Sequence, residues 1–376
     1  MPASSQASLA KALPFWISLL VLPLVWGVCR TGGWAILSLP AGAMALFILI
    51  DTIAGATQDG LDPETAEADL FWYRLITLIW APLQFLMIFG AIAAVAPSEE
   101  LTTLEKWGIF IGVGFVAGAI GIVYAHELMH QKPKAERLMG DLLMCMVLYG
   151  HFRTEHLLVH HRYVGTPRDP VTARYNEGFY RFFLRVLPGS LISAFRAERQ
   201  KLARGGLPWW STRNPFWLYW GFEAAFLLLA ALIGGWVGIW LFATQAFVAV
   251  FYLELINYVE HYGLTRKHLG GGKYEHILPR HSWNSDYKVS NWLLINLQRH
   301  SDHHYKPDRR FPLLQTYGPE DAPQLPSGYP FIAALALVPP IWRRRMNPKV
   351  RKWRAMYYPE ITDWAPYKAG TNPMPR

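Results

Sequence analysis

The sequence predicts an all-α integral membrane protein, with six transmembrane helices and a histidine-rich cap on the cytoplasmic side. Three observations predict this fold. Of the 376 residues, 52% are hydrophobic and only 17% are charged, whereas about 25% are charged in soluble domains. The apolar residues form blocks long enough to cross hydrocarbon, which takes about 20 helical residues. Nine of the 13 histidines stand at or just beyond the ends of apolar stretches.

Six apolar blocks with almost no interior charge are predicted to span the membrane. They cover about residues 13–30, 34–53, 73–96, 107–125, 216–235 and 239–259. A short glycine-rich segment, Gly234 to Gly238, separates the last two and predicts a helical hairpin. Residues 329–342 are also apolar, but prolines interrupt them, so we expect this stretch to lie in the membrane interface. Because no linker or internal repeat divides the chain, we expect one membrane-embedded domain over residues 1–376.

Charge distribution predicts the orientation. Residues 126–214 contain 14 Lys/Arg against 7 Asp/Glu, and residues 262–376 contain 18 against 8. Since basic residues concentrate on the cytoplasmic side, these two segments should form a cytoplasmic cap of a protein in the cell inner membrane. The basic amphipathic stretch 179–203 should lie along the membrane. A formal charge of +9 fits contact with anionic lipids, and no motif indicates nucleic acid as a partner.

The histidines are the candidate metal ligands. They form four clusters: His126 and His130; His156, His160 and His161; His261; and His300, His303 and His304. Spacings of three and four residues place side chains on one face of an α-helix. Neutral imidazole is the commonest protein ligand for iron, copper, zinc and nickel. Because one ion takes at most about six ligands, nine histidines predict a two-metal site at the membrane surface.

Acidic residues near the clusters are expected to orient the ligands. A carboxylate that receives the second ring N–H of a histidine fixes the ring and raises its basicity. The candidates are Glu127, Glu155, Glu260 and Asp302, with Asp169 as a turn residue that could also bond a ligand, and Asp286 and Asn291 as weaker candidates. The remaining histidines are interpreted as structural or surface residues: His151, His268, His276 and His281.

Two other functions compete with a two-metal enzyme. HELMH matches the H-E-x-x-H pattern of zinc proteases, in which the glutamate is the general base. A membrane zinc protease would need only one more ligand, however, and would leave six histidines without a role. A metal transporter would need ionisable residues within its spans, and Glu223 and Glu254 are the main candidates.

The chain resembles the membrane-bound alkane 1-monooxygenases, within the wider group of membrane fatty-acid desaturases and hydroxylases. NYVEHYGL at 257–264 and LQRHSDHH at 297–304 carry this resemblance, which extends from the first span to about Tyr317. It implies that the nine histidines hold two irons. Met129 and Val159 stand where the family commonly has glycine. These bulkier residues put the substrate range in question more than the reaction.

The resemblance implies hydroxylation of the terminal carbon of an alkane: the alkane, O₂, two electrons and two protons give the alcohol and water. An aryl-methyl (xylene-type) hydroxylase or a fatty-acid desaturase would share almost the same ligands. The resemblance also implies electrons from a rubredoxin and an NADH-dependent reductase. With only Cys29 and Cys145, the chain has no four-cysteine centre of its own. Basic residues suited to an acidic carrier are Arg309, Arg310 and Arg343 to Arg345.

Overall fold

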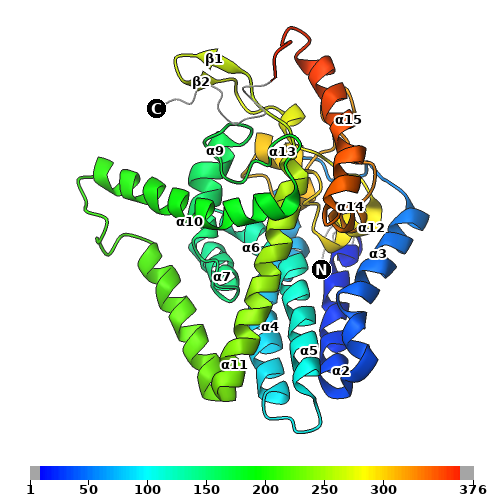
Figure 1. Ribbon diagram of the computed structural model, residues 1–376, viewed down its shortest axis with the longest axis vertical. Helices are drawn as coiled ribbons and strands as arrows, with labels where there is room; N and C mark the ends of the chain where they lie inside the picture. The colour runs from blue at the N-terminus through cyan, green and yellow to red at the C-terminus, as the bar shows by residue number, and fades with distance from the viewer. Residues whose placement is uncertain (1–8, 365–376) are drawn as a thin grey trace.

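A computed structural model describes residues 9–364 and is mostly helical. In this part of the chain, four helices are long and apolar enough to cross a membrane: Leu9–Thr31, Glu67–Val95, Thr103–Met129 and Phe216–His261. They comprise η1 (Leu13–Leu20) with α2 (Val21–Thr31); η3 (Glu67–Leu70) with α4 (Phe71–Val95); α5 (Thr103–Val116), the π-helix η4 (Ala117–Gly121) and α6 (Ile122–Met129); and α11 (Phe216–His261). These helices form the bundle in the lower part of Figure 1.

Three of the predicted spans, at 34–53, 216–235 and 239–259, are not separate long helices in the structure. The first is represented by η2 (Gly33–Ser38) and α3 (Ala41–Ala54). A 14-residue helix such as α3 extends only about 21 Å, less than the hydrocarbon thickness of about 30 Å. The other two belong to α11, which bends at Gly235, where φ is +57°. Figure 1 shows its two arms meeting at the lower end of the bundle, so the predicted hairpin is present as one bent helix.

Close packing of α5 and η4 against α11 aligns the helix ends that carry histidines. Gly114 and Gly118 face Gln245 and Ala249 of α11, and a Cβ on Gly114 would lie 2.5 Å from the Gln245 carbonyl oxygen. Small residues four apart permit this approach of two helix backbones. As a result, the second arm of α11 runs alongside the helix that ends in α6. His126 and His261 therefore reach the same end of the bundle.

The cap contains shorter elements that cover this end (Figure 1). They are α7 (Lys134–Cys145), α8 (Phe152–Glu155), the π-helix η5 (His156–His160), α9 (His161–Tyr163), α10 (Phe179–Arg204), β1 (His268–Gly270), β2 (Lys273–Tyr274), η6 (Pro279–His281), α12 (Lys288–Leu293), α13 (His300–Tyr305), η7 (Phe311–Leu313), α14 (Tyr329–Ala336) and α15 (Pro339–Tyr357). Strands β1 and β2 form an antiparallel pair. Helix α10 lies across the bundle axis in Figure 1.

Ion pairs of Arg310 and a helix cap attach this covering layer to the bundle. Arg310 pairs with Glu136 of α7 at 2.9 Å and with Glu67 of η3 at 2.6 Å. Asp51, near the end of α3, accepts hydrogen bonds from the backbone N–H groups of Val289 and Ser290 at the start of α12. A carboxylate in this position satisfies otherwise unpaired helix donors. Asp51 is buried by these contacts.

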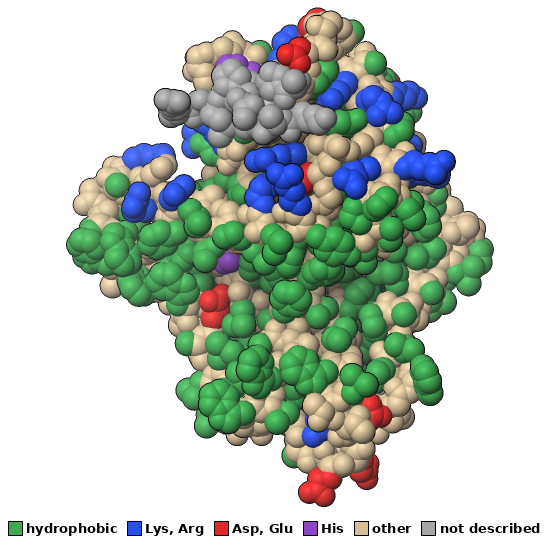
Figure 2. All heavy atoms as spheres, in the orientation of Figure 1, with side chains coloured by type: hydrophobic (Ala, Val, Ile, Leu, Met, Phe, Trp, Pro, Cys, Tyr) green, Lys and Arg blue, Asp and Glu red, His purple; other side chains and the backbone are tan. Residues whose placement is uncertain are grey.

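Side-chain types separate along the long axis of the molecule. Figure 2 shows hydrophobic side chains over the bundle and lysine and arginine side chains gathered over the cap. Exposed residues of the bundle include Leu46, Leu228, Leu232 and Trp240. Such a large exposed apolar surface fits helices surrounded by lipid.

Candidate metal centre

The nine clustered histidines converge where the bundle meets the cap. Their side chains divide into two groups, each with ligand atoms within 4.8 Å of one another. Group one contains His126, His130, His156, His161 and His303, and group two contains His160, His261, His300 and His304. The groups adjoin each other, since the rings of His161 and His304 have centroids 4.6 Å apart.

The ring nitrogens of group one are arranged around a common centre. The Nε2 atom of His156 lies 3.0 Å from that of His126, 3.0 Å from that of His130 and 2.9 Å from that of His161. The Nε2 atoms of His161 and His303 are 3.1 Å apart. A neutral imidazole has one N–H donor and one acceptor nitrogen. One nitrogen with three such neighbours cannot satisfy all of them by hydrogen bonding.

Group two has the same spacing. The Nε2 atom of His300 lies 3.1 Å from that of His261 and 3.0 Å from that of His304. With metal–nitrogen bonds of about 2.1 Å, neighbouring ligands at right angles around one ion are about 3.0 Å apart. The donor spacing in both groups therefore fits nitrogens that share a metal ion with near-octahedral geometry.

Burial keeps these side chains in the form that binds metal. Removal from solvent lowers the pKa of His130, His156, His161 and His303 well below the ordinary value, and neighbouring histidines lower it further. The pKa values of His300 and His304 are lowered for the same reasons. Neutral imidazoles offer a lone pair, which a metal ligand requires.

The local helix geometry decides which histidine joins which group. We expected His156 and His160, four residues apart, to share a face, but His156 belongs to group one and His160 to group two. Residues 156–160 form a π-helix, with the N–H of His161 donating to the carbonyl of His156. A π-helix repeats every five residues in its hydrogen bonding. His156 and His161 consequently point the same way.

Helix α13 serves both groups. His300 and His304, four residues apart, belong to group two, whereas His303 belongs to group one. This helix has only six residues, so its position must be set by its surroundings. Ser301 supplies one such contact, because its backbone N–H donates to Asn284 Oδ1 at 2.9 Å.

Two of the acidic candidates approach ligand nitrogens. Asp169 Oδ2 lies 2.9 Å from Nδ1 of His160, and its two oxygens also accept from the Thr172 hydroxyl and the Val171 N–H. This bond leaves Nε2 of His160 for group two. Glu260 Oε2 lies 3.3 Å from Nε2 of His300, and its Oε1 accepts from the Tyr329 hydroxyl at 3.0 Å. Glu260 therefore stands at the edge of group two on its metal-facing side.

The other three acidic candidates have different surroundings from those we expected. Glu127 accepts hydrogen bonds from Gln131 and from the Phe311 N–H. Asp302 accepts from Arg309, from the Gln315 N–H and from the Tyr317 hydroxyl. The hydrogen bonds of both carboxylates in the described chain connect them to cap segments and not to a clustered histidine.

Glu155 is fully buried, and neither of its carboxylate oxygens has a hydrogen-bond partner. Burial raises its pKa well above the ordinary value, and Asp169 and Glu254 raise it further.

The remaining histidines and candidates lie outside both groups in the described chain. His151 lies 3.4 Å from the Ser190 hydroxyl, and His281 contacts Glu275 and Tyr358. His268 is in β1, and His276 lies in the loop after β2. Asn291 donates to the Ser285 carbonyl, and burial raises the pKa of Asp286; neither makes a hydrogen bond to a group histidine.

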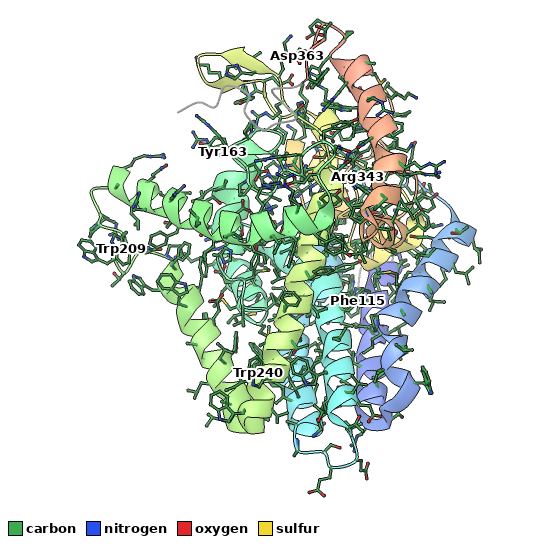
Figure 3. The ribbon with its side chains drawn as sticks, viewed as in Figure 1. Phe115, Tyr163, Trp209, Trp240, Arg343 and Asp363 are labelled. Carbon is green, nitrogen blue, oxygen red and sulfur yellow. The ribbon has the colours of Figure 1, made fainter. Side chains whose placement is uncertain are left out.

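An apolar groove in the bundle shares two lining residues with a small cavity at the histidines. A groove of about 530 Å³ is lined mainly by side chains of α2, α3 and α5, among them Leu24, Phe47 and Phe115. A second cavity of about 30 Å³ is lined by His126, His156 and His300. Tyr252 and Leu294 line both spaces, so they stand between the groove and the histidines. Figure 3 shows Phe115 in the bundle, below the cap. Nothing in the sequence singled out Tyr252 or Leu294, since both look like ordinary apolar packing residues.

Comparisons with known proteins agree with this arrangement. Residues 101–335 match the fatty acid desaturase family. The chain is 39% identical to alkane 1-monooxygenase 2 of Pseudomonas aeruginosa over 336 residues, covering 88% of this chain and 87% of that protein. It is 42% identical to alkane 1-monooxygenase 2 of Alcanivorax borkumensis over 250 residues, 66% of this chain and 65% of that protein. It is also 30% identical to the xylene/toluene monooxygenase hydroxylase component of Pseudomonas putida, over 77% of this chain and 76% of that protein.

The two groups predict separable metal losses. His303→Ala should empty the group-one position, and His304→Ala the group-two position, although the residues are adjacent. Each variant should retain about one ion, against the two ions that we expect in the unmodified protein. Metal analysis of purified protein, with circular dichroism to verify folding, measures this. His276→Ala, at an exposed histidine outside both groups, is the control; equal loss in all three variants would contradict the assignment.

The carboxylate contacts make a second prediction. Asp169→Asn removes the charge that orients His160 and should weaken metal affinity at group two by about 10- to 100-fold. Asp302→Asn should leave both affinities unchanged and lower thermal stability, because its partners are cap residues. Competition with a chelator measures the affinities. Equal metal loss in both variants would show that these hydrogen bonds do not distinguish a carboxylate that orients a ligand from one that stabilises the cap.

Proposed function

The chain belongs to the alkane 1-monooxygenases of the fatty acid desaturase family, and we propose that it hydroxylates the terminal carbon of alkanes at two iron ions held by its nine clustered histidines. One observation carries the proposal: two adjoining groups of buried imidazole nitrogens lie at ligand spacing beside an apolar groove. The reaction consumes O₂, two electrons and two protons.

The donor set favours iron over zinc. Catalytic zinc sites usually have three protein ligands and tetrahedral geometry, whereas the groups contain five and four histidines. A zinc protease would also need Glu127 as a base beside its metal. That carboxylate instead contacts Gln131 and the Phe311 backbone. Bound iron would supply redox activation of O₂, which zinc cannot.

The residues that line the groove and the inner cavity bind and position the alkane. An alkane dissolved in the bilayer can enter the apolar groove and extend past Tyr252 and Leu294 toward His126, His156 and His300. The narrow inner cavity fixes the end of the chain near the metals and excludes water from the reacting carbon. Positioning the last carbon in this way accounts for terminal hydroxylation.

Electrons are proposed to come from a rubredoxin reduced by an NADH-dependent reductase. Cys29 and Cys145 are both buried and free, so this chain offers no cysteine-bound electron carrier. The basic contact surface is smaller than we expected. Arg310 is buried against Glu67 and Glu136, and Arg309 binds Asp302. The exposed arginines at 344 and 345 in α15 remain suitable for an acidic carrier.

We propose six membrane crossings, counting α3 and both arms of α11 with the other three long helices. The cap would then face the cytoplasm across the inner membrane, as the excess of basic residues at 126–214 and 262–376 favours. Access to a cytoplasmic electron carrier is consistent with this orientation.

Product analysis tests the reaction. The protein, supplied with rubredoxin, reductase and NADH, should convert octane or hexadecane to the 1-alkanol with about two irons bound. The competing substrates are xylene and a fatty acid, because a xylene-type hydroxylase or a desaturase could use the same ligands. Faster turnover of xylene, or a desaturated acid as main product, would reject alkane specificity while leaving the iron site intact. Zinc in place of iron would reject the oxygenase.

The shared wall of the two cavities predicts a change in substrate range. Tyr252 packs edge-on against Phe115, with ring centroids 5.2 Å apart. Tyr252→Ala should join the groove to the inner cavity and raise kcat/KM for longer alkanes relative to octane by about tenfold. Tyr252→Phe, which keeps the ring, should behave like the unmodified protein. An unchanged chain-length profile in Tyr252→Ala would place the route elsewhere.

A further inference from the structure

An arginine-lined cavity in the cap has no role in the reaction described above. Its volume is about 560 Å³, and it lies between α10, the loop after α9, the Arg266 segment and α15. Six arginines line it: Arg168, Arg174, Arg185, Arg196, Arg266 and Arg354. Among the described lining residues, Asp169 is the one carboxylate, and it is occupied with His160 and Thr172. The cavity wall is therefore strongly positive.

Some of these arginines have protein partners. Arg185 pairs with Glu177 at 2.9 Å, and Arg266 donates to the carbonyl oxygens of Glu275 and Arg162. Arg354 differs, because it is only 9% exposed and its Nε and Nη2 atoms have no hydrogen-bond partner. Its guanidinium stacks between the rings of Tyr175 and Trp364, at 4.4 and 4.3 Å from their centroids. Ring stacking holds the cation in place but leaves these two donors unsatisfied.

The arginine charges also destabilise one another. Burial lowers the pKa of Arg174, and Arg185 lowers it further. Burial lowers the pKa of Arg354, and Arg351 adds to the effect. Buried donors and charges without partners cost free energy. An anion in the cavity would offset the repulsion among the lining arginines.

We propose that this cavity binds a phosphate group, carried by an anionic phospholipid headgroup or by a soluble phosphate ester. The planar guanidinium fork of the lining arginines matches the oxygens of phosphate. The cavity also lies at a suitable depth. Ile192 and Ser193 of α10 line it, while Leu184 and Leu191 of the same helix are exposed and apolar. Figure 2 shows basic side chains directly above the hydrophobic surface.

Phosphate binding can be measured on the metal-loaded protein in uncharged detergent. Inorganic phosphate and glycerol 3-phosphate are titrated against sodium chloride of equal ionic strength, with the thermal unfolding midpoint as readout. The test variant is Arg174→Gln combined with Arg196→Gln, since both residues are less buried than Arg354. The control is Arg344→Gln, which removes an exposed charge of α15 outside the cavity. A second arm compares retention of phosphatidylglycerol and phosphatidylcholine by native mass spectrometry from nanodiscs.

For a soluble ligand, we expect phosphate to raise the thermal unfolding midpoint in a saturable way. The apparent phosphate affinity should fall about tenfold in the double variant and less than about twofold in Arg344→Gln. Selective retention of phosphatidylglycerol, lost in the double variant alone, is the expected result for a lipid headgroup. Equal behaviour of the double variant and Arg344→Gln in both arms would overturn the proposal. So would a double variant that changes only the KM for an acidic protein carrier, because the arginines would then be a protein contact surface.

Discussion

Mutual repulsion among converging lone pairs is the constraint on which this structure depends. Nine imidazoles from four separate segments present their nitrogens to two small volumes, and removal from solvent keeps the rings neutral. Hydrogen bonds cannot satisfy all of these nitrogens, since Nε2 of His156 has three like neighbours at about 3 Å and Nε2 of His161 and of His300 has two each. A cation in each volume would convert this arrangement from a cost into a source of stability, since metal binding free energy is also folding free energy.

The helix packing follows from the need to bring distant segments to these two volumes. Gly114 and Gly118 allow α11 to approach the helix that ends in α6, which sets His261 near His126. The π-helix at 156–160 then divides one short segment between both groups, and α13 does the same from the opposite side. Each group is thus completed by a short segment that also contributes histidines to the neighbouring group. Distortion of either short helix would disturb both.

The histidines were predictable from the sequence because clusters of imidazoles at the ends of apolar stretches are typical of metal sites at a membrane surface. Their division into groups was not, since EHLLVHH has no feature that distinguishes an α-helix from a π-helix; tertiary packing decides that. The sequence also could not distinguish the acidic residues that contact a clustered histidine from those that do not. Asp169 contacts a ligand from a turn, nine residues from His160, whereas Glu127 and Asp302, close to the clustered histidines in sequence, point into cap contacts.

Ion pairs between residues far apart in the chain, and bends in the helices, could not be predicted from the sequence pattern either. Arg309 and Arg310 resembled surface charges, yet Arg310 pairs with carboxylates 174 and 243 residues away. The long spans were predictable from composition, because apolar blocks of this length have to be shielded from water. The short length of α3 and the bend at Gly235 depend instead on packing and on one residue with positive φ.

Asp169 lies between group two of the histidines and the arginine-lined cavity of the cap. One oxygen orients His160 of group two, and the same residue forms part of the wall of the arginine-lined cavity. Tyr252 and Leu294 separate the apolar groove from the small cavity that is lined by His126, His156 and His300. The metal groups therefore lie between a region that attracts hydrocarbon and a region that attracts anions. At a membrane surface these two regions coincide with the acyl chains and the phosphate layer, so binding of the surrounding lipid would orient the protein with its groove opening into hydrocarbon. The same membrane interface would then set two depths in the bilayer: the depth at which an alkane chain ends and the depth at which the histidines lie.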